Sequence, residues 1–97
     1  MHDEKKIQEL IAVLEANGVH VREEKLEGSA GGLCMLNGRR VLFLDATAPI
    51  TTRLDQCLIA LQQCVDTESV YLRPWIRALL EAQLNGIEQR DVQDAYR

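Results

Sequence analysis

Apolar residues near the N-terminus recur with the spacing of a single helical face. The positions follow the i, i+3, i+4, i+7 rule of an amphipathic helix. They are Ile7, Leu10, Ile11 and Leu14. We therefore predict a helix over residues 4–17, with Asp3 able to cap its start. Asn17-Gly18 marks the end, because glycine accepts the left-handed conformation that often terminates a helix.

The pattern then changes from a helical period to an alternation of apolar and polar residues. Val19-His20-Val21-Arg22 alternates in this way, which is typical of a short strand with one buried face. We expect Val19 and Val21 to point into the core. The charged residues 23–25 follow as the exposed end of this strand.

An Asn-Gly pair between two apolar runs gives the strongest local signal in the chain. Asn37-Gly38 suits a type I′ turn, which needs positive φ at both central positions. A two-residue turn also fixes the register, so that Leu36 lies opposite Arg39 and Leu33 lies opposite Leu42. The sequence therefore predicts a β-hairpin ending at Asp45.

Both faces of this hairpin are apolar near the Leu33 end. One face carries Cys34, Leu36, Arg39, Val41 and Phe43. The other carries Leu33, Met35, Arg40, Leu42 and Leu44. A sheet with one solvated face shows a cleaner alternation. We therefore expect a helix or another subunit to cover the second face, with the arginines at a solvated tip.

Two further helices are predicted after the hairpin. An apolar stripe indicates one from about Thr52 to Val65, capped by Thr51 or Thr52. Pro74 suits the first turn of the other, which ends near residues 85–86. The element order α-β-β-β-α-α predicts an α+β fold, a three-stranded antiparallel sheet packed with three helices. We expect one domain over residues 1–86 and a frayed or disordered tail over 87–97.

Composition narrows the class of protein. The chain has 97 residues, 46% of them hydrophobic and 27% charged, with a net charge of −4. These values are typical of one globular domain, and the acidic balance disfavours nucleic acid as a partner. No apolar run approaches a membrane span, and the N-terminus lacks the apolar core of a signal peptide. Three irregularly spaced cysteines predict free thiols in a reducing cytoplasm.

The residues that could bind a ligand cluster around a glycine-rich loop. Residues 28–32 read Gly-Ser-Ala-Gly-Gly, but a phosphate-binding loop leads into a helix and this one leads into a strand. A simple connector is therefore favoured, with no cofactor or metal implied. Cys57 and Cys64 share a helical face, and we predict that both pack in the hydrophobic core. A ligand site would combine Gly31, Gly32, Cys34 and Asp45, with His20 brought close by the fold. Asp45 also suits a turn formed through its own side chain.

Four other residues could contact a protein partner. Arg39 and Arg40 could meet an acidic surface, although charges at a hairpin tip also discourage edge-to-edge pairing. Tyr71 and Trp75 could anchor an interface, because aromatic residues dominate binding hot spots. Burial in the core is the alternative for Trp75.

The hairpin sequence from Gly31-Gly32-Leu33-Cys34 to Asp45, followed by Tyr71-Leu72-Arg73-Pro74, resembles a group of small bacterial proteins. Residues 28–66 also resemble the core of ImmA/IrrE-like metallopeptidases. That family carries a His-Glu-x-x-His zinc motif on the helix after the hairpin. The matching helix here, residues 53–64, contains no histidine and no glutamate. The resemblance therefore implies the shape of a peptidase core without its zinc ligands or its general base.

These observations favour a cytoplasmic, non-enzymatic protein–protein interaction module that self-associates. The motivation is a small sheet with two apolar faces and no assembled catalytic set. Two alternatives stay open. One is a small-ligand binder or thiol-dependent enzyme with its site near the glycine-rich loop. The other is a catalytically inactive, metallopeptidase-like sensor domain.

Overall fold

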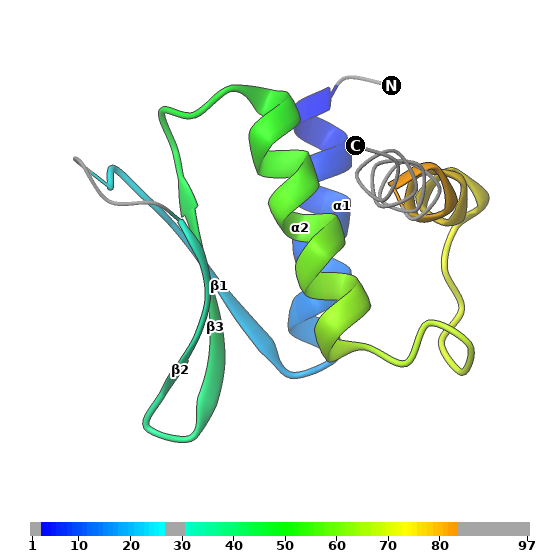
Figure 1. Ribbon diagram of the computed structural model, residues 1–97, viewed down its shortest axis with the longest axis horizontal. Coiled ribbons are helices and arrows are strands. Elements are labelled where there is room, and N and C mark those ends of the chain that lie inside the picture. Colours follow the sequence, from blue (N-terminus) through cyan, green and yellow to red (C-terminus); the bar gives the residue numbers. More distant parts are fainter. Residues whose placement is uncertain (1–2, 27–30, 84–97) are drawn as a thin grey trace, which may run out of the picture.

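The computed structural model of the chain describes residues 3–26 and 31–83, and it contains helices and one mixed sheet in an α+β fold (Figure 1). The elements are α1 (Asp3–Ala16), β1 (Val19–Glu24), β2 (Gly32–Leu36), β3 (Arg39–Asp45) and α2 (Ile50–Cys64), followed by a helix over residues 74–83. This confirms the predicted fold class and element order. The proposed tail at 87–97, the third helix's end near 85–86 and the loop residues 28–30 lie outside the described residues.

The hairpin has the predicted turn and register. Asn37 and Gly38 adopt φ values of 52° and 76°, the two positive angles that a type I′ turn requires. Leu36 then pairs with Arg39 and Leu33 pairs with Leu42 in the antiparallel ladder. The turn residues alone therefore set the pairing of all five residues of β2.

The prediction of a purely antiparallel sheet is wrong. The strand order is β1-β3-β2, and β1 runs parallel to β3, with Val19 opposite Arg40 and Glu24 opposite Asp45. The central position of β3 fits its composition, because Val41, Leu42 and Leu44 are all buried. An alternating pattern predicts which face of a strand is buried, but it does not say which neighbour the strand pairs with or in which direction.

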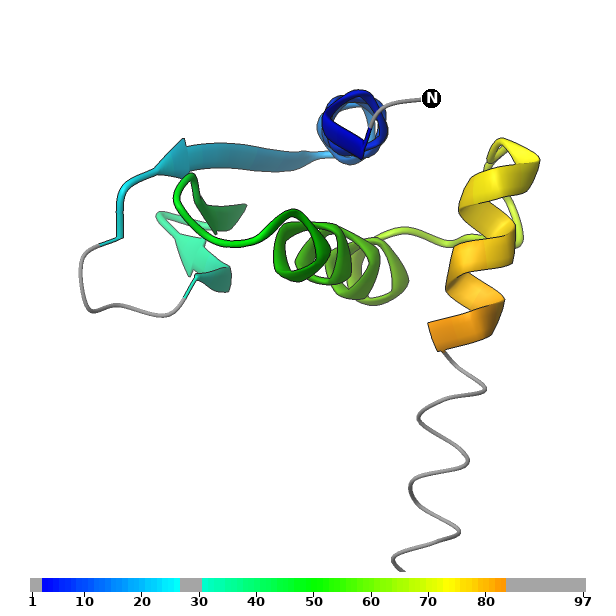
Figure 2. The same ribbon diagram turned by 90° about the horizontal axis from the view of Figure 1, so that it is seen from above.

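Figures 1 and 2 show three layers: the sheet, then α1 and α2 side by side, then the helix over residues 74–83. Val19, Leu42 and Leu44 point from the sheet into the core between the first two layers. Within the described part of the chain, both long helices therefore lie on one face of the sheet. No helix there covers the other face, the one that carries Cys34 and Phe43.

The second long helix begins earlier than the sequence predicts. It starts at Ile50, so the expected caps Thr51 and Thr52 lie inside its first turn. Pro49 takes the N-cap position without a side-chain cap, and the Arg53 amide donates to the Pro49 carbonyl at 3.1 Å. The proline ring fixes φ near the value that leads into a helix, so the hydroxyl side chains are not needed to start it.

Candidate functional site

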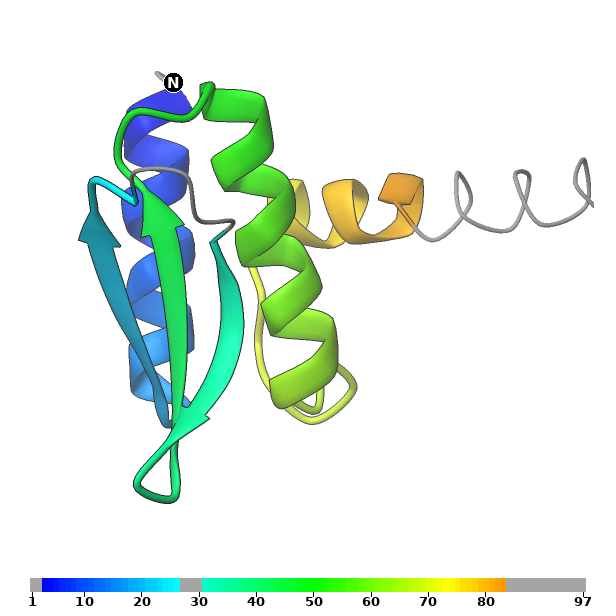
Figure 3. The same cartoon turned by 60° about the vertical axis from the view of Figure 1, so that its left-hand side comes forward.

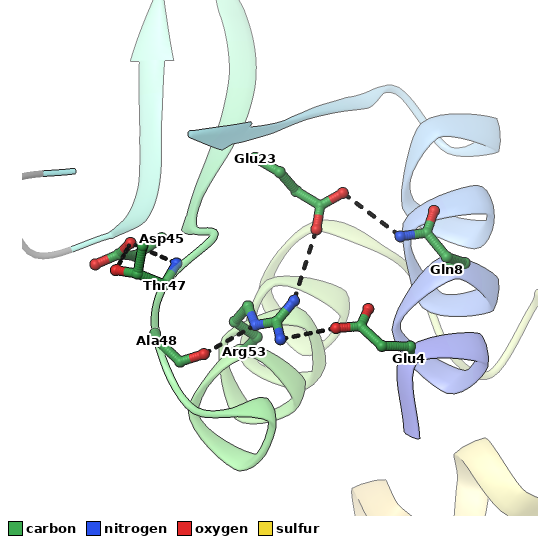
Figure 4. Close-up of polar contacts among 7 residues, drawn as sticks. All are labelled: Glu4, Gln8, Glu23, Asp45, Thr47, Ala48 and Arg53. Atoms are coloured by element: carbon green, nitrogen blue, oxygen red, sulfur yellow. Dashed lines mark hydrogen bonds and ion pairs between the residues drawn. The ribbon is translucent and has the colours of Figure 1, made fainter. Parts of the chain in front are cut away.

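A buried arginine forms the centre of a polar cluster between α1, α2 and β1 (Figure 4). Only 10% of the Arg53 side chain is exposed. Its Nη2 donates to Glu4 Oε1 at 2.8 Å and its Nε donates to the Ala48 carbonyl at 3.2 Å. Its Nη1 lies 3.9 Å from Glu23 Oε2, and Glu23 Oε1 accepts from Gln8 Nε2 at 3.5 Å. We call these residues the Arg53 cluster.

The Arg53 cluster connects α1, β1 and α2 through the contacts of one guanidinium. A guanidinium stays charged at any physiological pH, so it cannot exchange protons as an acid or base. The nearby thiol of Cys57 is fully buried. Burial, reinforced by the negative charge of Glu23 and opposed by Arg53, raises the pKa of Cys57 to about 12. The thiol is therefore protonated at neutral pH and is not a nucleophile.

The sequence contains a signal for the burial of Arg53. Counting in helical steps of four, seven and eight from Arg53 leads to Cys57, Ala60 and Leu61. All three are buried in the structure, as Arg53 is. A charged residue on the apolar stripe of a helix predicts a buried charge with partners on neighbouring elements.

The raised pKa of Cys57 predicts a loss of stability in alkali. The folded thiol binds its proton up to about pH 12, whereas the unfolded thiol releases it near pH 9.0. The folded state therefore holds more protons than the unfolded state between these values. The contribution of Cys57 to the free energy of unfolding is therefore fully present below pH 9. Above pH 9 this contribution decreases by up to about 1.4 kcal/mol per pH unit. Urea unfolding at pH 8, 9 and 10 should show a steeper decline for the wild type than for Cys57→Ala. Equal slopes would contradict a buried, protonated thiol.

A hollow of about 330 Å³ lies between the start of β2 and the outer side of α2. Its lining residues are Gly31, Gly32, Leu33, Leu42, Gln56, Ile59, Ala60 and Gln63. Two of the four residues predicted to bind a ligand, Gly31 and Gly32, therefore line this hollow. Gln56 Oε1 is buried beside them without a hydrogen-bond partner in the described structure. Apart from this amide and Gln63, the side chains of the hollow are apolar.

The other expected ligand residues do not join this hollow. Cys34 lies on the opposite face of the sheet, where His20 and Cys34 both flank Val41 from neighbouring strands. Two strand spacings, about 10 Å, separate their backbones, and Val41 lies between them. Asp45 Oδ1 accepts from the amide and hydroxyl of Thr47 at 2.9 and 2.7 Å. These hydrogen bonds lower the pKa of Asp45. They also form the side-chain turn for which the sequence showed Asp45 to be suited.

The four expected interaction residues fall into two separate groups. Arg39 is exposed at the hairpin end, and Arg40 Nη1 donates to the Cys64 carbonyl at 3.1 Å. A cation there compensates the negative end of the α2 dipole. Both arginines also line a smaller hollow of about 150 Å³. Tyr71 is 81% exposed just before helix 74–83, and Trp75 is half-buried with the Lys6 ammonium 5.9 Å from its ring. Helix 74–83 lies on the side of the helix pair away from the sheet (Figure 2).

The edge position of β2 is the feature that sequence reasoning missed: among residues 3–26 and 31–83, β2 pairs with β3 on one side and with no strand on the other. The strand Gly-Leu-Cys-Met-Leu carries no charge, whereas the opposite edge strand β1 contains His20, Arg22, Glu23 and Glu24. Met35 is 62% exposed, and the adjacent Leu36 and the hollow residue Ile59 are more than 40% exposed. Natural sheets protect a free edge with charged residues or cover it. We call β2 with Ile59 and the adjoining hollow the β2 edge. Figure 3 shows β2 beside β3 at one side of the sheet.

Comparison with known proteins finds no match to this chain. No protein-family model, curated protein or solved structure matches this chain. Within residues 3–26 and 31–83, His, Cys, Asp and Glu side chains do not gather in groups of three that could hold a metal ion. The helices in those same ranges are too short or too polar to cross a membrane.

Proposed function

We propose that this chain is a non-catalytic protein-interaction domain that binds an extended segment of protein along the β2 edge. The observation that supports the proposal most directly is an uncharged edge strand beside an apolar hollow. Strand addition of this kind draws its affinity from main-chain hydrogen bonds and its specificity from pockets for alternate side chains. Both components are available on the β2 edge.

The backbone groups that a partner strand needs can be identified from the register. The two-residue turn makes Leu36 and Arg39 a hydrogen-bonded pair. Hydrogen-bonded and non-hydrogen-bonded pairs alternate along an antiparallel ladder, so Cys34 and Gly32 also bond to β3. Leu33 and Met35 therefore direct their N–H and C=O groups away from the sheet. An added strand would satisfy these four groups.

The side-chain pocket lies on the same face as the helices. Leu33 lines the hollow together with Ile59 of α2. An added strand places every second side chain on this face, and one of them would lie directly beside Leu33. An apolar side chain there covers Leu33 and Ile59 and removes their surface from water. The β2 edge therefore favours an extended segment with an apolar residue at that position.

Selection of peptides from an unbiased display library provides the test. We expect binders with alternating apolar residues, and we expect them to perturb the NMR amide signals of Leu33 and Met35. Met35→Lys, which adds a charge at the edge, should weaken their binding at least tenfold. Tyr71→Lys is the matched control, because it replaces an exposed aromatic residue just before helix 74–83, which lies on the side of the helix pair away from the sheet. Binders that perturb residues 71–83 instead, or that respond equally to both substitutions, would overturn the proposal.

A further inference from the structure

We propose that the segment that pairs with β2 is β2 of a second copy of this chain, antiparallel and with the twofold axis at Cys34. This inference rests on the proposed function and specifies its partner. A single register follows from the length of the strand. Centring the pair on Cys34 places Gly32 opposite Leu36 and Leu33 opposite Met35, so that all five residues of each strand are paired. Any other antiparallel register leaves part of the strand without a partner.

The hydrogen bonds fit this register. Leu33 and Met35 are the residues whose backbone groups point away from β3, and the register places them opposite each other twice, once on each side of the axis. Each of these pairs can exchange two N–H···O=C bonds. Cys34 opposes its own copy as a non-hydrogen-bonded pair, which agrees with its backbone groups being used by β3. The interface is self-complementary, as a twofold dimer requires.

Side-chain size and charge also favour a second copy. Met35 of the second copy lies beside Leu33, at the hollow that Ile59 also lines. On the opposite face, Leu36 of the second copy lies opposite Gly32, which has no side chain, and can reach the half-buried Phe43. Because β2 carries no charge, self-pairing opposes no like charges. Pairing β2 with β1 of a second copy would instead place these apolar residues against Arg22, Glu23 and Glu24.

Light scattering of the full chain in reductant is the first measurement. We expect a dimer mass, and we expect Met35→Lys to weaken dimerisation at least tenfold while Tyr71→Lys leaves it unchanged. Monomers at every concentration up to the millimolar range would overturn the inference. The proposed function would survive that result if selected peptides still bound the β2 edge, so the two failures are distinguishable.

Thiol cross-linking tests the register itself. The Cα atoms of a non-hydrogen-bonded pair lie about 4.5 Å apart, within the range that a disulfide spans. Diamide takes up two protons and two electrons from two thiols as the S–S bond forms. In a Cys64→Ser background, we expect diamide to join most chains through Cys34, which is exposed. The matched control is Leu36→Cys with Cys34→Ser, whose thiols would lie about 13 Å apart along the strands. Cross-linking of the control as efficient as that of Cys34 would overturn the inference.

Discussion

Replacing Arg53 by alanine is expected to lower the free energy of unfolding by about 2–3 kcal/mol. The side chain is only 10% exposed and contacts three other parts of the chain: α1 through Glu4, β1 through Glu23, and the β3–α2 connection through Ala48. Without Arg53, the Ala48 carbonyl loses a hydrogen bond and the Glu23 carboxylate loses an ion pair. The packing of the buried aliphatic stem is lost as well. Urea unfolding monitored by circular dichroism measures the loss.

The ion pairs themselves account for little of this effect. Glu4 is 55% exposed, and exposed carboxylates gain at most about 1 kcal/mol from an ion pair. The larger part comes from the charge-assisted hydrogen bond that the desolvated guanidinium donates to the Ala48 carbonyl, together with the packing of the buried stem. Arg53→Lys should therefore recover only part of the stability, because an ammonium cannot reproduce the planar fork.

Arg73 supplies a matched control for Arg53. It donates to Glu9 of α1 at 2.7 Å, a contact slightly shorter than the 2.8 Å contact of Arg53 with Glu4 of the same helix. Its side chain is 56% exposed, however, so Arg73→Ala should cost no more than about 0.5 kcal/mol. Equal losses for the two alanine variants would show that burial is not what makes Arg53 important.

The parts of the fold that local chemistry determines could be predicted from the sequence. The apolar stripe of α1 and the Asn37-Gly38 turn each involve residues close together in the chain, and both are confirmed. The turn also defines the register of β2 against β3, because a two-residue loop permits only one pairing. The same register then identifies which backbone groups of β2 point away from β3.

Contacts between distant residues could not be predicted in this way. The choice of β3 rather than β2 as the neighbour of β1 depends on how α1 and α2 cover the sheet, which no local pattern records. The β2 edge was missed for the same reason. Its uncharged composition is visible in the sequence, but its meaning depends on β2 being an edge strand and β3 being central. Arg53 has partners 30 and 49 residues away, Glu23 and Glu4.

After Arg53, the substitution with the next largest expected effect on stability is in the glycine-rich loop. Replacing Gly31 by alanine should lower the free energy of unfolding by about 2–3 kcal/mol. An added Cβ would lie 2.5 Å from the Phe43 carbonyl oxygen and 3.2 Å from Gln56 Nε2. The carbonyl belongs to the central strand and cannot move without displacing the sheet, so the start of β2 must shift instead. Gly31 is therefore required for space and not for a phosphate-binding turn.

Two comparisons separate this steric reason from other effects of glycine. Gly38→Ala introduces a Cβ with no atom within 4 Å, at a φ of 76°, and should cost only about 1 kcal/mol. Gly31→Ala combined with Gln56→Ala relieves the side-chain contact but leaves the carbonyl in place, so most of the loss should persist relative to Gln56→Ala alone. Urea unfolding of the four variants tests both expectations. A larger loss for Gly38→Ala, or full recovery in the double variant, would show that the backbone of β3 is not the obstacle. If β2 pairs with a partner strand as proposed, the loss from Gly31→Ala should be accompanied by faster amide exchange at Leu33 and Met35, because displacing the start of β2 also displaces the proposed binding edge.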